Sequence, residues 1–224
     1  MDSPRHEPID SEWYKKAFNE LYPVLYAHRS LEAAAEEVRF ALSVVGLGEN
    51  DLVLDFCCGA GRHSVELVRS GKRVVGLDFS CALLREAHKR FKGLALLVRA
   101  DMRSVPFEAS FDAVFSFFTS FGYFLRSEDN EQALREMSRS LKPGGRFFID
   151  HINQAHIKQN LIPTTKRTVG NLTVIETRWI ENDRVNKKTE IYEGASLRDT
   201  LVESVQLYSV EEFCGLLKQV GLQV

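Results

Sequence analysis

The chain has 224 residues, of which 44% are hydrophobic and 27% charged, and its formal net charge is -2. This length fits one large domain, or one domain with a sizeable insertion. The near-neutral charge argues against a general electrostatic grip on nucleic acid or on an anionic membrane. No run of residues is long and apolar enough to cross a bilayer, and the polar start of the chain lacks the pattern of a signal peptide. We therefore expect a cytoplasmic protein.

The four cysteines do not form a metal-binding pattern. Cys57 and Cys58 are adjacent, and the other two have no ligand-pair spacing. Zinc sites in proteins require spaced ligand pairs, so no metal is expected, and free thiols in a reducing compartment are the simplest interpretation.

Two amphipathic helices are predicted before residue 48. The first begins near Ser11 and carries apolar residues at intervals of three and four as far as Pro23. The second runs from Leu31 to Val45 and is closed by Gly46. Both helices would cover one side of a sheet. Alternatively, they would act as a lid that brings tyrosine hydroxyls close to a ligand; the candidates are Tyr14, Tyr22 and Tyr26.

Residues 51–150 alternate between apolar strands and helices. The predicted strands are 51–56, 73–77, 94–99, 111–117 and 145–150, and the predicted helices are 61–70, 80–91 and 129–141. Strands that alternate with helices require crossover connections, which give a parallel sheet covered on both faces. The near-continuous apolar character of the strands agrees with such a sheet.

The pattern changes after residue 150. A short helix is predicted at 154–160, and three strand-like segments follow at 171–181, 184–193 and 197–208, before a last helix at 210–220. The turn chemistry at 181–183 favours an antiparallel hairpin. Residues 222–224 resemble the opening of another strand, so we expect a truncated chain in which the final strands of the sheet are missing.

The stretch 53–64 combines a buried strand, a glycine turn and a helix start. Glycine at positions 59 and 61 allows a sharp turn and the close approach of a ligand to the main chain. The free N–H groups at the start of the next helix form a partly positive pole. The pattern favours a nucleotide-type crevice at the end of a parallel strand. A tight strand-to-helix turn that binds no ligand would fit the same pattern.

Three further features follow predicted strands. Asp78 ends the second strand and would accept hydrogen bonds from ribose hydroxyls, unless it serves as a turn or helix-cap residue. Asp101 and Met102 follow the third strand and suit an adenine ring, unless Asp101 is a surface loop residue. The aromatic stretch 116–124 follows the fourth strand. It would wall a pocket, or its rings would only fill space.

In this order and spacing, these motifs resemble those of class I, S-adenosylmethionine-dependent methyltransferases. The segments that carry the resemblance are 53–64, 76–80, 100–103, 111–114 and 141–146. The flanking residues are similar to a bacterial and archaeal subgroup of small-molecule methyltransferases with an antiparallel insertion after the fifth strand. The sequence departs from the family at Cys57, where glycine is usual, and at the C-terminus, where two strands normally follow.

The resemblance implies a fold and a division of the chain. The fold is α/β and Rossmann-like, a doubly wound, mostly parallel sheet with N-terminal helices and a small antiparallel insertion. The expected parts are an N-terminal helical lid at 1–48, a cofactor-binding core at 49–155 and 209–224, and an antiparallel β insertion at 156–208 over the active site.

The resemblance also implies a reaction and site residues. The cofactor would be S-adenosylmethionine, the product S-adenosylhomocysteine, and the acceptor a small molecule methylated on oxygen, nitrogen or carbon. Residues expected to bind the cofactor are Tyr26, Asp55, Cys57, Gly59, Gly61, Arg62, Asp78, Phe79, Asp101, Met102 and Phe117. His151 is the first candidate for a general base, followed by Tyr123 and His63, unless His151 has only a structural role. Neither a membrane nor a nucleic acid is an expected partner, and the pattern does not indicate an oligomeric state.

Other classes of protein share parts of this pattern. A methyltransferase acting on nucleic acid or protein would have the same cofactor site, but the former usually adds a basic domain. A nicotinamide-dependent oxidoreductase would share the glycine turn, but would leave Asp101 and the glycines at 144 and 145 unexplained. A non-catalytic binding module would keep the fold with a blocked acceptor pocket.

Overall fold

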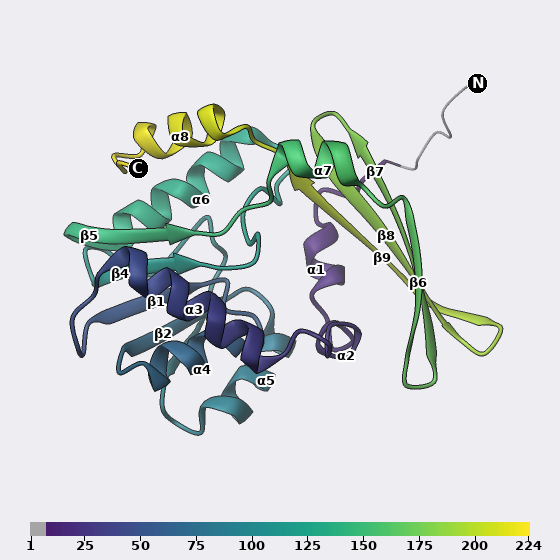
Figure 1. The fold of residues 1–224 in the computed structure, drawn as a ribbon, viewed down its shortest axis with the longest axis horizontal. Coiled ribbons are helices and arrows are strands. Elements are labelled where there is room, and N and C mark those ends of the chain that lie inside the picture. Colours follow the sequence, from purple (N-terminus) through teal and green to yellow (C-terminus); the bar gives the residue numbers. More distant parts are fainter. Residues whose placement is uncertain (1–7) are drawn as a thin grey trace.

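A parallel sheet with helices on both faces stands beside a separate antiparallel sheet (Figure 1) in the computed structural model, which describes residues 8–224. The parallel sheet has the strand order β3-β2-β1-β4-β5. Its strands are β1 (Leu52–Phe56), β2 (Arg73–Asp78), β3 (Leu96–Arg99), β4 (Phe111–Ser116) and β5 (Leu141–Ile149). No helix within residues 8–224 is long and apolar enough to cross a membrane.

Helices cover the two faces of this sheet, as the sequence predicts. They are α3 (Leu31–Val45), α4 (Arg62–Arg69), α5 (Cys81–Phe91), α6 (Ser127–Ser140) and α8 (Val210–Gln219). Val53 of β1 packs in a cluster with residues of α3 and α4, whereas Leu54 and Phe56 belong to a cluster with residues of α6 and α8. Successive side chains of a strand point to opposite faces, and both faces are apolar here because both are covered.

Two elements differ from their predicted bounds by more than two residues. The first N-terminal helix is split into α1 (Trp13–Ala17) and α2 (Tyr22–Leu25). The side chain of Asn19 accepts a hydrogen bond from the Leu21 backbone N–H at 2.8 Å, a local turn that interrupts the helix. Strand β5 begins at Leu141 because this residue pairs with Phe111 before the register shifts.

The antiparallel sheet contains one strand more than predicted. Its four strands are β6 (Thr164–Val169), β7 (Leu172–Glu181), β8 (Arg184–Glu193) and β9 (Ser196–Gln206), and α7 (Gln154–Asn160) precedes them. Strand β6 is almost entirely polar and only alternates between exposed and half-buried positions, so it gives no apolar signal. Leu25 of α2 packs in one apolar cluster with Val174 and Ile191 of this sheet.

One buried arginine connects the antiparallel sheet to the loop after β4. Arg184 is only 8% exposed, and its guanidinium donates hydrogen bonds to the carbonyl oxygens of Gly122, Tyr123 and Phe124 at 3.0–3.1 Å. The Gln206 backbone N–H also donates to the Gly122 carbonyl, at 2.8 Å. These bonds fix the loop against the antiparallel sheet.

Candidate functional site

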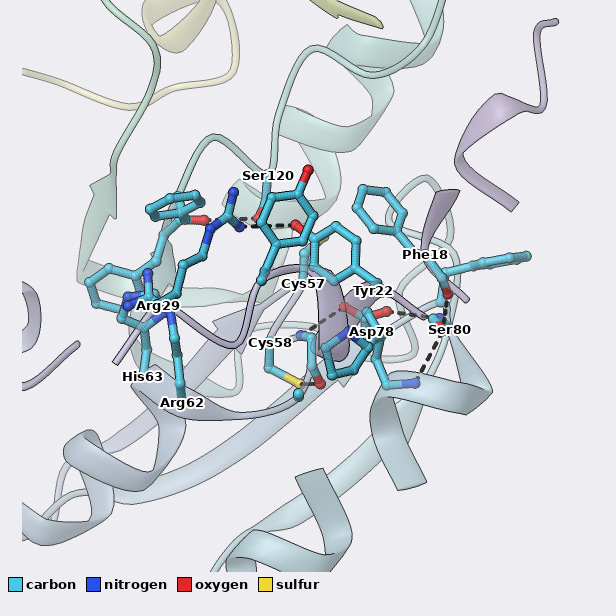
Figure 2. Close-up of a pocket in the computed structure, with 18 of the residues that line it drawn as sticks. Phe18, Tyr22, Arg29, Cys57, Cys58, Arg62, His63, Asp78, Ser80 and Ser120 are labelled. Atoms are coloured by element: carbon cyan, nitrogen blue, oxygen red, sulfur yellow. Dashed lines mark hydrogen bonds between the residues drawn. The ribbon is translucent and has the colours of Figure 1, made fainter. Parts of the chain in front are cut away.

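A cavity of about 290 Å³ lies at the carboxyl ends of β1, β2 and β4, beneath α1 and α2. Strand order reverses between β1 and β4, and ligands of open α/β sheets bind at this switch point. Figure 2 shows Asp78, Ser80 and Phe18 at one end of the cavity and Arg29, Arg62 and His63 at the other. Most of the lining is aromatic or apolar, with a few polar groups, as is usual for small-molecule sites.

The glycine turn after β1 adopts the backbone conformation that glycine favours. Gly59 and Gly61 have φ angles of 55° and 78°, and a Cβ on Gly61 would lie 2.6 Å from the Phe91 ring. Cys57 shares the left-handed conformation, with φ of 63°, which explains why glycine suits this position. Cys57 and Gly59 line the cavity, whereas Gly61 shapes the turn without lining it.

Asp78 lies against this turn and lines the cavity. Its carboxylate accepts hydrogen bonds from the backbone N–H groups of Gly59 and Ser80, each at 2.8 Å. Burial raises the pKa of Asp78 to about 6, and the backbone hydrogen bonds oppose the shift. The Asp78 side chain therefore stabilises the turn and also presents a carboxylate to the cavity. A turn role and a ligand-binding role, the two roles expected from the sequence, are thus compatible.

Asp55 and Arg62 flank the glycine turn, and only Arg62 lines the cavity. Asp55 is 1% exposed, does not line the cavity, and accepts a hydrogen bond from the Ser64 hydroxyl. Burial raises the pKa of its carboxyl group. Arg62 lines the cavity and forms an ion pair with Glu37 at 3.0 Å. Asp55 thus stabilises the start of the helix that follows the glycine turn, and Arg62 faces the cavity.

Phe79 and Met102 line the cavity, but Asp101 does not. Both oxygens of Asp101 accept hydrogen bonds from the Arg103 guanidinium, at 3.0 and 2.7 Å. Burial alone would raise the pKa of Asp101, but hydrogen bonds from Arg103 outweigh it and lower this pKa. The predicted role of Asp101 beside an adenine ring thus competes with an ion pair that the sequence did not reveal.

The aromatic loop after β4 walls the cavity. Phe117 stacks on the His63 ring with centroids 4.2 Å apart, and Phe118, Ser120 and Tyr123 also line the cavity. Burial raises the pKa of the Tyr123 phenol well above its ordinary value. Tyr123 therefore keeps its proton at neutral pH and is available as a hydrogen-bond donor.

His151 lies outside the cavity. Its ring stacks on Phe213 of α8 at 5.2 Å and lies 6.0 Å from Phe121 and 5.8 Å from Tyr208, measured between ring centroids. Burial lowers the pKa of His151 to about 4. His151 thus packs among aromatic rings outside the cavity, whereas the other two candidates, Tyr123 and His63, line it.

The N-terminal tyrosines line the cavity, as the predicted role of a lid requires. They are Tyr14, Tyr22 and Tyr26. The Tyr26 hydroxyl donates to Glu203 at 2.9 Å and accepts from Lys187, so the antiparallel sheet helps to place this ring. Sequence reasoning missed Arg29, whose position in a short polar connection carries no distinctive signal.

Comparisons with known proteins support this description. Residues 53–145 match the family model described as a methyltransferase domain. Over 113 residues the chain is 39% identical to a demethylmenaquinone methyltransferase of Mycobacterium marinum, covering 50% of this chain and 46% of that protein. Over 138 residues it is 32% identical to a dTDP-3-amino-3,4,6-trideoxy-alpha-D-glucopyranose N,N-dimethyltransferase of Streptomyces venezuelae, covering 61% and 58%.

The fold has solved counterparts over nearly its whole length. The crystal structure of an S-adenosylmethionine-dependent methyltransferase from Clostridium acetobutylicum superposes with a TM-score of 0.74 at 19% identity, covering 94% of this chain and 93% of the other. The matched sequence regions span about half the length of the curated relatives. Residues 53–145 therefore match a methyltransferase domain, and the chain shares its fold with a solved methyltransferase, which confirms the predicted fold class.

Proposed function

We propose that this protein is an S-adenosylmethionine-dependent methyltransferase that methylates a small-molecule acceptor and releases S-adenosylhomocysteine. One observation carries the proposal: the carboxylate of Asp78 and the glycine turn meet in a cavity at the switch point of the parallel sheet. The matched methyltransferase domain contains both features.

The residues that line the cavity fit the parts of this cofactor. Asp78 would accept the ribose hydroxyls, and Phe79 and Met102 would contact the adenine ring. The main chain is open at Gly59, where no atom lies within 3.9 Å of an added Cβ, so the methionine portion of the cofactor fits along the turn. Arg62 would meet its carboxylate, with Tyr26, Cys57 and Phe117 as further lining residues; Asp55 and Gly61 support the turn from behind.

The sulfonium of S-adenosylmethionine supplies an activated methyl group, so the protein has to align an acceptor and exclude water. Orientation alone contributes up to roughly 7–11 kcal/mol in favourable cases. We infer that the lid at 1–48, of which residues 1–7 lie outside the described part of the chain, and the insertion at 156–208 enclose the acceptor above the core at 49–155 and 209–224. Tyr123 would orient the acceptor through its phenol O–H, because it lines the cavity and stays protonated.

A small acceptor agrees with the names of the relatives. One relative is named for demethylmenaquinone and the other for an amino sugar carried on dTDP, both of which are small organic molecules. The net charge of -2 provides no general attraction for nucleic acid.

Calorimetry with S-adenosylhomocysteine tests the proposal. We expect micromolar-range binding by the wild type, and a loss of roughly tenfold to a hundredfold for Asp78→Ala, because hydrogen bonds to a charged group contribute about 1.5–3 kcal/mol. Glu49→Ala removes an exposed acid and serves as the control. Tight binding of NAD, with none of S-adenosylhomocysteine, would contradict the proposal.

A further inference from the structure

Glu37 of α3 does not line the cavity, but it contacts two residues that do. One oxygen of its carboxylate, Oε2, lies 3.0 Å from Nη2 of Arg62 and 2.5 Å from Nε2 of His63. Arg62 and His63 are the first two residues of α4, directly after the glycine turn, and Figure 2 shows both at the same end of the cavity. The hydrogen bond with His63 lowers the pKa of the Glu37 carboxyl group, so this acid is ionised at neutral pH.

Arg62 has one ion-pair partner among residues 8–224, and that partner is Glu37. The Arg62 side chain is only 15% exposed and lies over the Phe118 ring, with the guanidinium carbon 4.9 Å from the ring centroid. The guanidinium of Arg29 lies over the same ring at 4.0 Å. Burial lowers the pKa of Arg62, Arg29 lowers it further, and Glu37 opposes both effects. Without the charge of Glu37, the partly buried Arg62 would therefore face a second arginine with no acid to hold it.

The ion pair leaves part of the Arg62 guanidinium for a ligand. Arg62 lines the cavity but Glu37 does not, and the pair engages Nη2. Nε and Nη1 thus remain for the two oxygens of a ligand carboxylate, in the bidentate geometry that arginine favours. A side chain that is already held in its bound orientation loses less conformational freedom when the ligand binds, so this contact would raise affinity.

We propose that Glu37 is a positioning residue for cofactor binding, which holds the Arg62 guanidinium in the orientation that meets the carboxylate of S-adenosylmethionine. This inference rests on the proposed function, which assigns Arg62 to that carboxylate. Glu37 acts through Arg62 and does not itself contact the cofactor. Because Glu37 belongs to α3, within the segment predicted as a lid, the same ion pair connects this segment to the start of α4.

Calorimetric titration with two ligands tests the inference. S-adenosylhomocysteine has the carboxylate of the cofactor, whereas 5′-methylthioadenosine keeps the adenosine and the sulfur but has no carboxylate. We expect Glu37→Gln to bind S-adenosylhomocysteine roughly threefold to tenfold more weakly than the wild type, and 5′-methylthioadenosine with a change of less than about twofold. Glutamine keeps a hydrogen-bond acceptor for His63 and removes only the charge. Glu36→Gln, at the exposed neighbouring position of α3, is the matched control and should change neither affinity.

A double-mutant cycle identifies the residue through which Glu37 acts. Arg62→Ala alone should weaken the binding of S-adenosylhomocysteine by roughly tenfold to a hundredfold, and adding Glu37→Gln should cause no further loss. Urea unfolding of each variant checks that the chain is still folded.

The outcomes separate this inference from the proposed function. If Glu37→Gln weakens both ligands equally, or behaves like Glu36→Gln, the positioning role is refuted, while binding of S-adenosylhomocysteine by the wild type still supports a methyltransferase. If Glu37→Gln keeps its full effect in the Arg62→Ala background, Glu37 acts by another route, such as its contact with His63, and the inference is refuted. If the wild type binds neither ligand, the proposed function fails and this inference fails with it.

Discussion

Replacing Arg184 with methionine would separate the antiparallel sheet from the loop that walls the cavity. The guanidinium makes six hydrogen bonds, three to carbonyl oxygens of residues 122–124 and three to Ser204 and Gln206. No carboxylate pairs with it among residues 8–224, and burial lowers the pKa of Arg184 to about 10. The cost of burying the charge thus offsets part of the hydrogen bonding.

The loop carbonyls keep second donors when the guanidinium is removed. Trp13 Nε1 donates to the Tyr123 carbonyl at 3.1 Å, and Asn130 Nδ2 donates to that of Phe124 at 2.9 Å. The loss in the free energy of unfolding is therefore far smaller than the sum of six hydrogen-bond contributions. We expect Arg184→Met to lower the free energy of unfolding by about 2–4 kcal/mol.

Urea unfolding at pH 7 measures this change. Arg184→Lys should recover little of the loss, because three ammonium donors cannot reproduce the planar fork. The control Arg135→Met removes an exposed arginine and should cost less than about 0.5 kcal/mol. If Arg184→Met were as stable as this control, the assignment of Arg184 as the link between sheet and loop would be refuted.

Three further predictions concern the turn and the titrating groups. Gly61→Ala should cost about 2–4 kcal/mol, whereas Gly71→Ala, with the same φ of 78° but open space around it, should cost only about 1–2 kcal/mol; equal losses in urea unfolding would exclude the clash with Phe91. Because the pKa of Asp78 is about 6, affinity for S-adenosylhomocysteine should fall as the pH drops below 6, and calorimetry at pH 5–8 should find this dependence absent in Asp78→Asn. The pKa of His151 is about 4 when folded and about 6.5 when unfolded, so its stabilising contribution is complete above pH 6.5 and is lost as the pH falls toward 4. His151→Gln should remove that part of the acid destabilisation in urea unfolding without changing S-adenosylhomocysteine affinity; a loss of affinity would return His151 to the site.

Most of the residues that the sequence predicted to bind the cofactor line the cavity, whereas His151, the first candidate for a general base, does not. Asp78, Gly59 and Met102 follow consecutive strands of one parallel sheet, and the carboxyl ends of those strands must meet at one edge. The ion pair of Asp101 with Arg103, only two residues away, carries no signal in the sequence, and the role of Asp101 toward an adenine ring stays a prediction. His151 also follows a strand of this sheet, yet its side chain packs against α8.

The sequence by itself determined the parallel sheet, the helices on its two faces and the glycine turn, because periodicity and turn chemistry are local properties of the chain. Only the tertiary structure decided that β6 completes a four-stranded antiparallel sheet and that Arg184 joins this sheet to the loop after β4. It also decided that Arg29 lies between Tyr26 and Phe118, two residues that are 92 positions apart in the sequence. Contacts of this kind depend on how the two sheets and the N-terminal helices pack together, and no local pattern encodes them.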